Sequence, residues 1–222
     1  MRKLVKGIVE FQKNLQPSYR DTLARLALGQ SPDALYIGCS DSRVAVNVFA
    51  STDPGDLFVV RNVGNLVPPC GCDGQSTADE SEAAAIEFAL TALNVSHIII
   101  CGHSECGAMQ ALIKGRENIK SKNLSSWLRH GEEGLQDLAS QESFAKELTT
   151  HNRLSQLNVL RQIHHLKTYP VIQERLKAGT LSLHGWWFDI SHADVYAYEE
   201  SFKKFVKFDE AQAERILSKL KN

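Results

Sequence analysis

Three side chains that bind metal ions well follow two apolar runs of this sequence. Cys39 ends the run Ala34–Cys39, while His103 and Cys106 come just after the run His97–Cys101. If the two runs are neighbouring strands, the three side chains can meet at one crevice. Two thiolates and one imidazole suit zinc, and three protein ligands leave one coordination position open, which is typical of a catalytic site. Zinc held in this way would convert a bound water into a hydroxide nucleophile.

Asp41 and Arg43 follow Cys39 and extend the same polar segment. Each feature alone has a simpler interpretation. A cysteine at a strand end is usually a small buried hydrophobe, and an acid and a base two residues apart usually form a solvated ion pair. Because all five residues fall at the carboxyl ends of predicted strands, the joint pattern favours a metal site.

The elements that would position these residues alternate along the chain. Short, mostly apolar runs predict strands over 34–39, 57–60, 97–101 and 181–190. Helices are expected over 79–93, from about 106–107, across most of 121–168, over 170–179 and from about 209, where Ile216, Leu217 and Leu220 would face inward. This alternation indicates an α/β fold with a mostly parallel central sheet flanked by helices. No linker or repeat divides residues 1–222, which predicts a single domain.

Residues 1–30 are expected to form a helical arm ahead of the first strand. Leu4, Ile8, Phe11 and Leu15 recur at helical spacing before Pro17 interrupts the pattern. The apolar face of such an arm could pack on another subunit, or it could cover the sheet of its own chain. The pattern alone favours neither arrangement.

The composition is that of an ordinary globular protein. Of the 222 residues, 43% are hydrophobic and 23% are charged, and the formal net charge is −1. This balance disfavours nucleic acid as a partner, and no apolar run approaches the roughly 20 residues of a membrane-spanning helix. No secretory signal follows Met1, so a cytoplasmic protein is expected. Five scattered cysteines do not indicate a disulfide framework.

The segments Cys39-Ser-Asp41-Ser-Arg43 and His103-Ser-Glu-Cys106-Gly107 resemble the two-part signature of the β-class carbonic anhydrases. Their separation and the intervening segment 58–65 match as well, and the similarity runs from about residue 23 to 190. The resemblance implies one Zn²⁺ per chain, held by Cys39, His103 and Cys106. It also implies reversible hydration of carbon dioxide to bicarbonate and a proton by zinc-bound hydroxide, in a homodimer or homotetramer.

The resemblance makes Asp41 and Arg43 a catalytic pair. A carboxylate beside the metal can accept a hydrogen bond from the hydroxide and aim its lone pair at the substrate carbon. Arg43 can grip Asp41 through two N–H groups and keep it ionised and away from the metal. Without that grip Asp41 could bind the zinc and close the site, as happens in one form of the family.

A set of expected substrate-binding residues also follows from the resemblance. Gln30 matches a glutamine that donates a hydrogen bond to substrate in plant-like members, and Phe58 and Val63 match apolar pocket residues. Phe88 stands where those members often have tyrosine, and Gly107 ends the second signature segment. Without the resemblance, the three apolar residues would be assigned to the core.

A second branch of the family has an inhibitory bicarbonate site built from Trp, Arg and Tyr. The corresponding positions here are Tyr36, Arg61 and Phe188, so two of the three residues differ. We therefore expect the plant-like branch, with a site that stays open. Zinc with two thiolates is formally neutral and should acidify water less than zinc with three histidines, so activity should rise on the alkaline side of neutrality.

Two other functions use the same residues. A thiol-dependent redox protein could use Cys39 or the pair Cys70 and Cys72, which could instead be an accessory metal clip or two ordinary loop thiols. A zinc-stabilised binding module would hold the metal with no open position. His97, His184 and His192 could relay protons, and the sequence does not choose among them.

Overall fold

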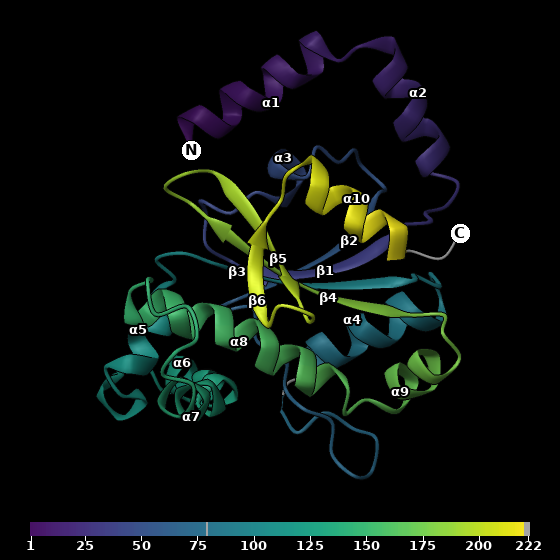
Figure 1. The fold of residues 1–222 in the computed structure, drawn as a ribbon. Coiled ribbons are helices and arrows are strands. Elements are labelled where there is room, and N and C mark those ends of the chain that lie inside the picture. Colours follow the sequence, from purple (N-terminus) through teal and green to yellow (C-terminus); the bar gives the residue numbers. More distant parts are fainter. Residues whose placement is uncertain (79, 220–222) are drawn as a thin grey trace.

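The computed structural model describes residues 1–78 and 80–219. Six strands form one sheet in the order β2-β1-β3-β4-β5-β6, which Figure 1 shows at the centre of the molecule. The strands are β1 (Ala34–Cys39), β2 (Leu57–Asn62), β3 (His97–His103), β4 (Ser182–Asp189), β5 (Asp194–Glu199) and β6 (Lys204–Lys207). The first four are parallel, and β5 and β6 run antiparallel. The predicted α/β class and mostly parallel sheet are confirmed.

The antiparallel hairpin β5–β6 was not predicted. Its strands carry charged residues at the turn ends, and β6 has only 4 residues, so neither shows the continuous apolar run of a buried parallel strand. The hairpin adds to the free edge of β4 and leaves β2 and β6 as the two edge strands of the sheet. β3 also extends to His103, two residues beyond the predicted end, so this histidine is the last residue of the strand.

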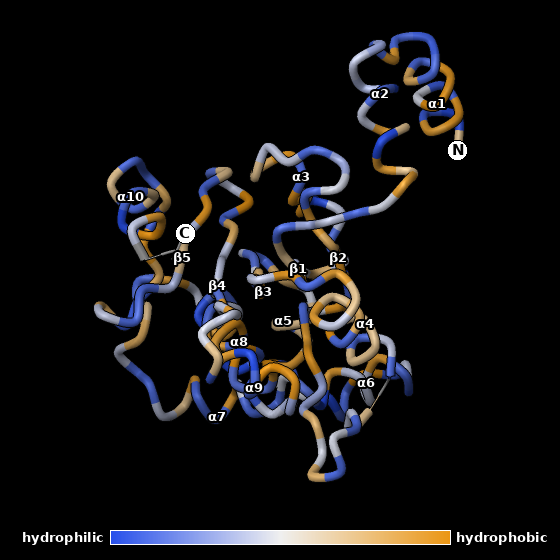
Figure 2. Tube along the Cα trace, turned by 90° about the vertical axis from the view of Figure 1, so that its right-hand side faces the viewer, coloured by the Kyte–Doolittle hydropathy of each residue, from blue (hydrophilic) through white to orange (hydrophobic). Residues whose placement is uncertain are grey.

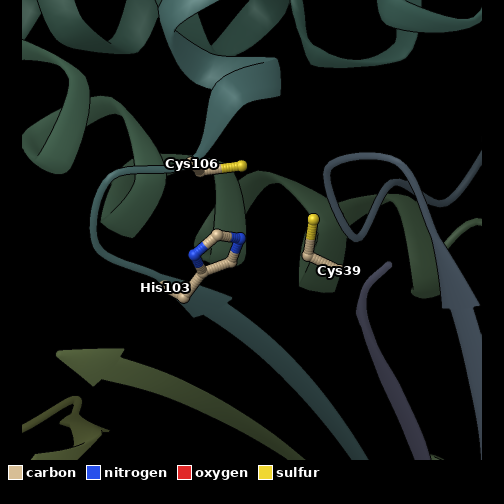
Figure 3. A group of neighbouring side chains, drawn as sticks. All are labelled: Cys39, His103 and Cys106. Carbon is tan, nitrogen blue, oxygen red and sulfur yellow. The ribbon is translucent and has the colours of Figure 1, made fainter. Parts of the chain in front are cut away.

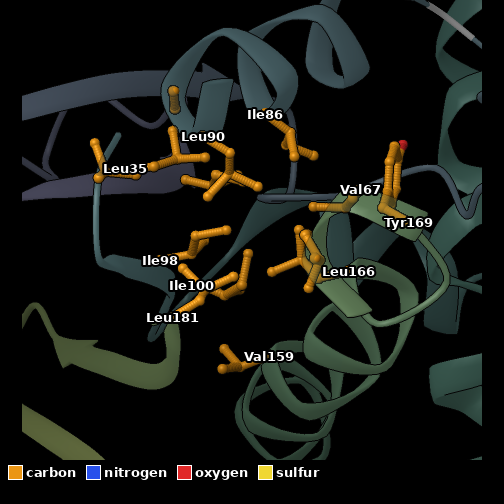
Figure 4. Close-up of a cluster of buried hydrophobic side chains, with 14 residues drawn as sticks. Leu35, Val67, Ile86, Leu90, Ile98, Ile100, Val159, Leu166, Tyr169 and Leu181 are labelled. Carbon is orange, nitrogen blue, oxygen red and sulfur yellow. The ribbon is translucent and has the colours of Figure 1, made fainter. Parts of the chain in front are cut away.

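Helices cover both faces of the sheet. In Figure 1, α4 (Glu80–Thr91), α8 (Thr150–Leu166) and α9 (Pro170–Lys177) lie on one side, and α3 (Val46–Phe49) and α10 (Glu210–Lys219) on the other. The larger core lies between the sheet and the first group, where side chains such as Leu35, Ile100 and Leu166 are fully buried (Figure 4). Burial of this apolar surface is the main force that holds the sheet and helices together.

The remaining helices gather beside one end of α8. They are α5 (Gly107–Ile113), α6 (Lys122–Leu128) and α7 (Glu133–Ser140), with two short 3₁₀ helices at Arg116–Asn118 and Arg129–Gly131. They enclose a second, smaller core that includes Leu66, Met109 and Leu154 together with Cys39 and Cys106. The side chains at the carboxyl ends of β1 and β3 are therefore packed among apolar neighbours.

The N-terminal arm consists of α1 (Arg2–Asn14) and α2 (Pro17–Leu26) and has no buried residue. Figures 1 and 2 show it standing clear of the sheet. The arm therefore does not cover the sheet of its own chain, and the apolar face formed by Leu4, Ile8 and Phe11 is exposed.

Two smaller expectations concern the C-terminus and membranes. Ile216 is partly buried, but the expectation that Leu217 faces inward is wrong, because 64% of this residue is exposed on the outer side of α10. Leu220 lies outside the described residues. Among the described residues, no helix combines the length and the apolar character that crossing a bilayer requires.

Candidate metal centre

Parallel pairing brings the three expected metal ligands together. Cys39 is the last residue of β1 and His103 the last of β3, and these strands are direct neighbours with Gly38 opposite Cys101. Cys106 is the N-cap residue of α5. All three side chains are buried, their ligand atoms lie within 4.8 Å of one another, and Figure 3 shows them converging on one point.

The histidine is oriented as a metal ligand. Its Nδ1 lies 2.8 Å from the carbonyl oxygen of Ser104, which can only accept, so Nδ1 carries the proton. Nε2 then presents a lone pair, yet it is buried and has no hydrogen-bond partner among the described residues. An unpaired buried nitrogen is costly, and a metal ion between the two sulfurs would satisfy it.

The two thiols contact each other and shift each other's ionisation. A hydrogen bond from the Cys106 thiol lowers the pKa of Cys39, while the same contact and burial raise the pKa of Cys106. The amide N–H of Gly64, 3.4 Å from Sγ, also stabilises the Cys39 thiolate. The contacts therefore favour Cys39 as the first thiolate of the pair, and a bound dication would displace the remaining proton.

Asp41 and Arg43 form the expected pair beside these ligands. Arg43 Nε donates to Asp41 Oδ1 at 2.9 Å and Nη2 donates to Oδ2 at 2.7 Å, in a two-pronged arrangement. This guanidinium holds the pKa of the Asp41 carboxyl well below its usual range. Oδ2 lies 4.0 Å from His103 Nε2, so the carboxylate is adjacent to the ligand cluster but is held by Arg43.

Backbone contacts keep this pair in place. Arg43 Nη2 also donates to the carbonyl of Glu105 at 3.1 Å. Glu105 has a positive φ of 56°, and Asn152 of α8 holds it by accepting from its N–H at 2.8 Å and donating to its Oε1 at 3.1 Å. Arg61 donates to the carbonyls of Cys39 and Asp41 and ties the turn between them to β2.

The other expected site residues divide into two groups. Val63 directly precedes Gly64, and Gly107 opens α5 next to Cys106, so both are near the cluster. Phe58 and Phe88 contact each other, with ring centroids 5.8 Å apart, but they lie elsewhere. Phe58 pairs with Leu35, four residues before Cys39, which corresponds to about 13 Å along the strand.

Gln30 is also far from the centre of its own chain. It is exposed in the segment between α2 and β1, where it lines a hollow with Arg25 and Asp53. The fold therefore does not bring Gln30, Phe58 or Phe88 to the metal ligands of the same chain.

The three positions that correspond to the inhibitory bicarbonate site are occupied by internal contacts. The ring of Tyr36 is buried and lies over Gly38, where a Cβ atom would fall 2.7 Å from its hydroxyl oxygen. Phe188 stacks on Phe49 at 4.8 Å. Arg61 spends its Nε and Nη2 on backbone carbonyls, as described above.

Sequence reasoning missed the residues that support the centre from a distance. Trp127 of α6 and a polar stripe on α8 form hydrogen bonds with the segment after β2 and with the segment that carries His103 and Cys106. The stripe comprises Asn152, Ser155, Asn158, Gln162 and His165, all buried. Polar residues recurring every three or four positions on the otherwise buried side of a helix were the available signal, because such groups need partners when they leave water.

The remaining cysteines and histidines stay outside the cluster. Cys70 is partly buried and Cys72 is exposed, and both are free thiols. His97 and His184 face each other across β3 and β4 with 3.1 Å between Nδ1 and Nε2, at the end of β3 opposite His103. Within the described residues, Cys39, His103 and Cys106 are the only group with metal-binding spacing.

Comparison with known proteins agrees with this geometry. The carbonic anhydrase family matches residues 34–195. A carbonic anhydrase of Synechococcus elongatus is 39% identical over 88% of this chain and 70% of its own length. One of Pseudomonas aeruginosa is 35% identical over 95% of this chain and 93% of its own length.

Solved structures extend the likeness to three dimensions. The β-carbonic anhydrase CcaA has a TM-score of 0.85 and 39% identity, with 94% of this chain and 99% of that chain covered. One of two tetrameric β-carbonic anhydrases from Sordaria macrospora has a TM-score of 0.71 and 30% identity, with 88% and 92% covered. With the cysteine, histidine and aspartate–arginine geometry in place, the chain belongs to the β-class carbonic anhydrases, enzymes that hydrate carbon dioxide.

Proposed function

We propose that the chain hydrates carbon dioxide at a single zinc ion held by Cys39 Sγ, His103 Nε2 and Cys106 Sγ. The observation that carries this proposal is the unpartnered, buried Nε2 that faces two buried sulfurs within 4.8 Å. Three ligands of this type leave a fourth position open, and zinc bound there would make a water molecule acidic. One such cluster in the described residues supports one ion per chain in this proposal.

Asp41 acts as the orienting acceptor in this proposal. Its carboxylate stays ionised because Arg43 donates to both oxygens, so it can accept a hydrogen bond from the attacking oxygen nucleophile. Accepting that bond directs the nucleophile's lone pair toward the carbon of the substrate. Arg43 in turn prevents Asp41 from turning toward His103 Nε2 and taking the open position.

Metal analysis and stopped-flow kinetics test this assignment together. Purified, unstripped protein should contain about one zinc per chain, and Cys39→Ser should lose both the metal and carbon dioxide hydration. Cys72→Ser is the matched control, because Cys72 is exposed and far from the ligands in the fold. Thiol-dependent redox activity of the metal-free protein would instead support a redox protein, and bound zinc without any hydration of carbon dioxide would support a zinc-stabilised binding module.

We also infer that two copies of the chain combine. The arm has no buried residue, and it exposes the apolar side chains of Leu4, Ile8 and Phe11. A second set of exposed apolar side chains lies in or near the edge strand β2: Val59, Val63 and Phe88. β2 also leaves one row of backbone N–H and C=O groups unpaired at the sheet edge, which a second copy could cover.

The positions of the pocket residues support this inference. Phe58 lies at the start of β2 and Val63 just beyond its end, so one chain cannot place both at one metal centre. If a second copy lies antiparallel against β2, its Phe58 and Phe88 approach the metal centre of the first copy, beside which Val63 lies. The substrate pocket would then be formed by both chains, as either a homodimer or half of a homotetramer.

Truncation separates this inference from the metal assignment. Deleting residues 1–15 should shift the protein toward the monomer in light scattering after gel filtration. Carbon dioxide hydration should fall with that shift while the zinc content per chain is retained. If the truncated protein keeps the oligomeric state and the hydration activity of the full chain, the role of the arm is refuted.

We further propose that the site belongs to the open, plant-like branch. Asp41 is bound by Arg43. At the positions that would hold an inhibitory bicarbonate, Tyr36 is buried, Phe188 stacks on Phe49, and Arg61 donates from Nε and Nη2 to backbone carbonyls. A crystal structure grown near neutral pH in which Asp41 binds the metal would refute this proposal.

A further inference from the structure

Two hydrogen bonds connect Trp127 with the Cys39 sulfur through one peptide group. The indole Nε1–H of Trp127 donates to the carbonyl oxygen of Val63 at 2.8 Å. The N–H of Gly64 donates to Cys39 Sγ at 3.4 Å. The Val63 carbonyl and the Gly64 N–H are the two ends of the same planar peptide bond. Trp127, in α6, is thus connected to a metal ligand 88 residues earlier in the chain without touching it.

The peptide group passes the effect of the first bond to the second. A donor at the carbonyl oxygen draws electron density out of the amide, which makes its N–H a stronger donor, and hydrogen bonds in series polarise one another in this way. The same bond fixes the plane of the peptide, so it also sets the direction in which the Gly64 N–H points. Trp127 therefore affects both the strength and the aim of the bond to sulfur.

Gly64 is held in this position from its other side as well. Its φ is +86°, and a Cβ atom would lie 2.9 Å from the Cβ of Ala108, so only glycine lets the backbone approach α5 so closely. Asn158 Nδ2 of α8 donates to the Gly64 carbonyl at 3.1 Å. Trp127 thus binds the Val63 carbonyl and Asn158 binds the Gly64 carbonyl, and the Gly64 N–H between them faces Cys39.

We propose that Trp127 is a positioning residue that acts on the metal through Cys39 by drawing charge from the thiolate sulfur. The inference rests on the metal site proposed above. A thiolate gives much of its charge to a bound cation, and an N–H donor at the sulfur reduces that transfer. The cation then remains a stronger acid. This offsets part of the loss of acidity that the cation undergoes when two thiolates take the place of neutral ligands.

The variant that isolates this effect is Trp127→Phe. It keeps an aromatic ring at a position that packs against His130, at 5.6 Å between ring centroids in the wild type, and it removes the N–H donor together with part of the ring volume. Trp186→Phe is the matched control, because the Trp186 indole donates no hydrogen bond within the described part of the chain and its ring packs against Phe208. Asn158→Leu is a second variant that loosens Gly64 from the other carbonyl.

Three measurements report on the sulfur rather than on folding alone. In the cobalt(II)-substituted protein, the sulfur-to-cobalt charge-transfer band of Trp127→Phe should move to longer wavelength, because a more electron-rich sulfur releases an electron more easily. Zinc binding, measured by competition with a chelator, should weaken by up to about tenfold, because the Gly64 N–H no longer holds the Cys39 sulfur in position for the metal. The pH midpoint of carbon dioxide hydration should rise by a few tenths of a unit. Asn158→Leu should shift all three in the same direction.

The outcomes separate the two proposals. If wild-type protein contains no metal, the metal assignment fails, and the role of Trp127, which rests on it, fails with it. If wild type binds metal but the band and the pH midpoint of Trp127→Phe match those of wild type, the role of Trp127 is refuted. Equal shifts in Trp127→Phe and Trp186→Phe would also refute it, because loss of a donor would then not be the cause.

Discussion

Removal of the Arg43 side chain should close the site. Arg43→Leu deletes the two side-chain N–H donors that hold the Asp41 carboxylate at 2.9 and 2.7 Å, and it leaves only the backbone N–H of residue 43, which donates to Oδ1 at 3.0 Å. The released carboxylate is already 4.0 Å from His103 Nε2, so a rotation of its side chain brings it among the metal ligands. There it would compete for the open position that catalysis requires.

The contacts set the size of the effect. A hydrogen bond between charged groups contributes about 1.5 to 3 kcal/mol when it is shielded from water. Here 48% of the Arg43 side chain is exposed, against 16% of Asp41, so solvent screening reduces the sum of the two bonds to about 2 kcal/mol. That energy corresponds to roughly a 30-fold change in the ratio of open to closed sites, since 1.36 kcal/mol is tenfold.

Stopped-flow carbon dioxide hydration would measure the loss directly. Arg43→Leu should lower kcat/KM by up to roughly 30-fold without loss of zinc, because kcat/KM follows the fraction of open sites, and the visible spectrum of the cobalt(II) form should show the added carboxylate ligand. Arg43→Lys is the matched control: it keeps the positive charge but cannot grip both oxygens, so its activity should be intermediate. Activity of Arg43→Leu within twofold of wild type, or an unchanged cobalt spectrum, would refute the reasoning.

Three further outcomes are expected. Hydration activity in saturating buffer should rise between pH 6 and pH 9, because two thiolates make the metal less able to acidify a bound water. A flat pH profile would contradict this. Asp41 should not contribute to the pH dependence in that range, because its lowered pKa keeps it ionised. Gly38→Ala should lower the free energy of unfolding by about 1 to 3 kcal/mol in urea titrations, because the new Cβ would fall 2.7 Å from the buried Tyr36 hydroxyl oxygen. Added bicarbonate should inhibit without cooperativity, because Arg61 is engaged by two backbone carbonyls; a sigmoidal inhibition curve would show otherwise.

Much of the fold was readable because buried parallel strands carry a strong local signal. The run at 97–101 is apolar on both faces, and Pro170 with Gly179 marks a helix at both ends, so β3 and α9 were expected near their observed bounds. The hairpin β5–β6 has no such signal. Its strands are stabilised by pairing with β4, a partner that only the assembled sheet supplies.

The N-terminal arm shows a second limit of sequence patterns, because its helix was predicted but the surface that it contacts was not. Its helical periodicity was visible in the positions of Leu4, Ile8 and Phe11, and the structure confirms α1. Periodicity reports that a helix has an apolar face but not which surface that face meets. The structure settles that this surface is not the sheet of the same chain.

By itself, the sequence determined the chemistry of the centre: two thiols, an imidazole and an aspartate–arginine pair, placed by contiguous segments at strand ends. Only the tertiary structure decided which hydrogen bonds hold those groups: His103 Nδ1 to a backbone carbonyl, the Gly64 N–H to the Cys39 sulfur, and the Trp127 indole to the peptide group before Gly64. It also placed Phe58 too far along β2 to reach the metal ligands of its own chain. The reason is physical. Residue type and local spacing fix what a side chain can do, whereas a hydrogen bond between atoms far apart along the chain exists only once packing has brought them within about 3 Å.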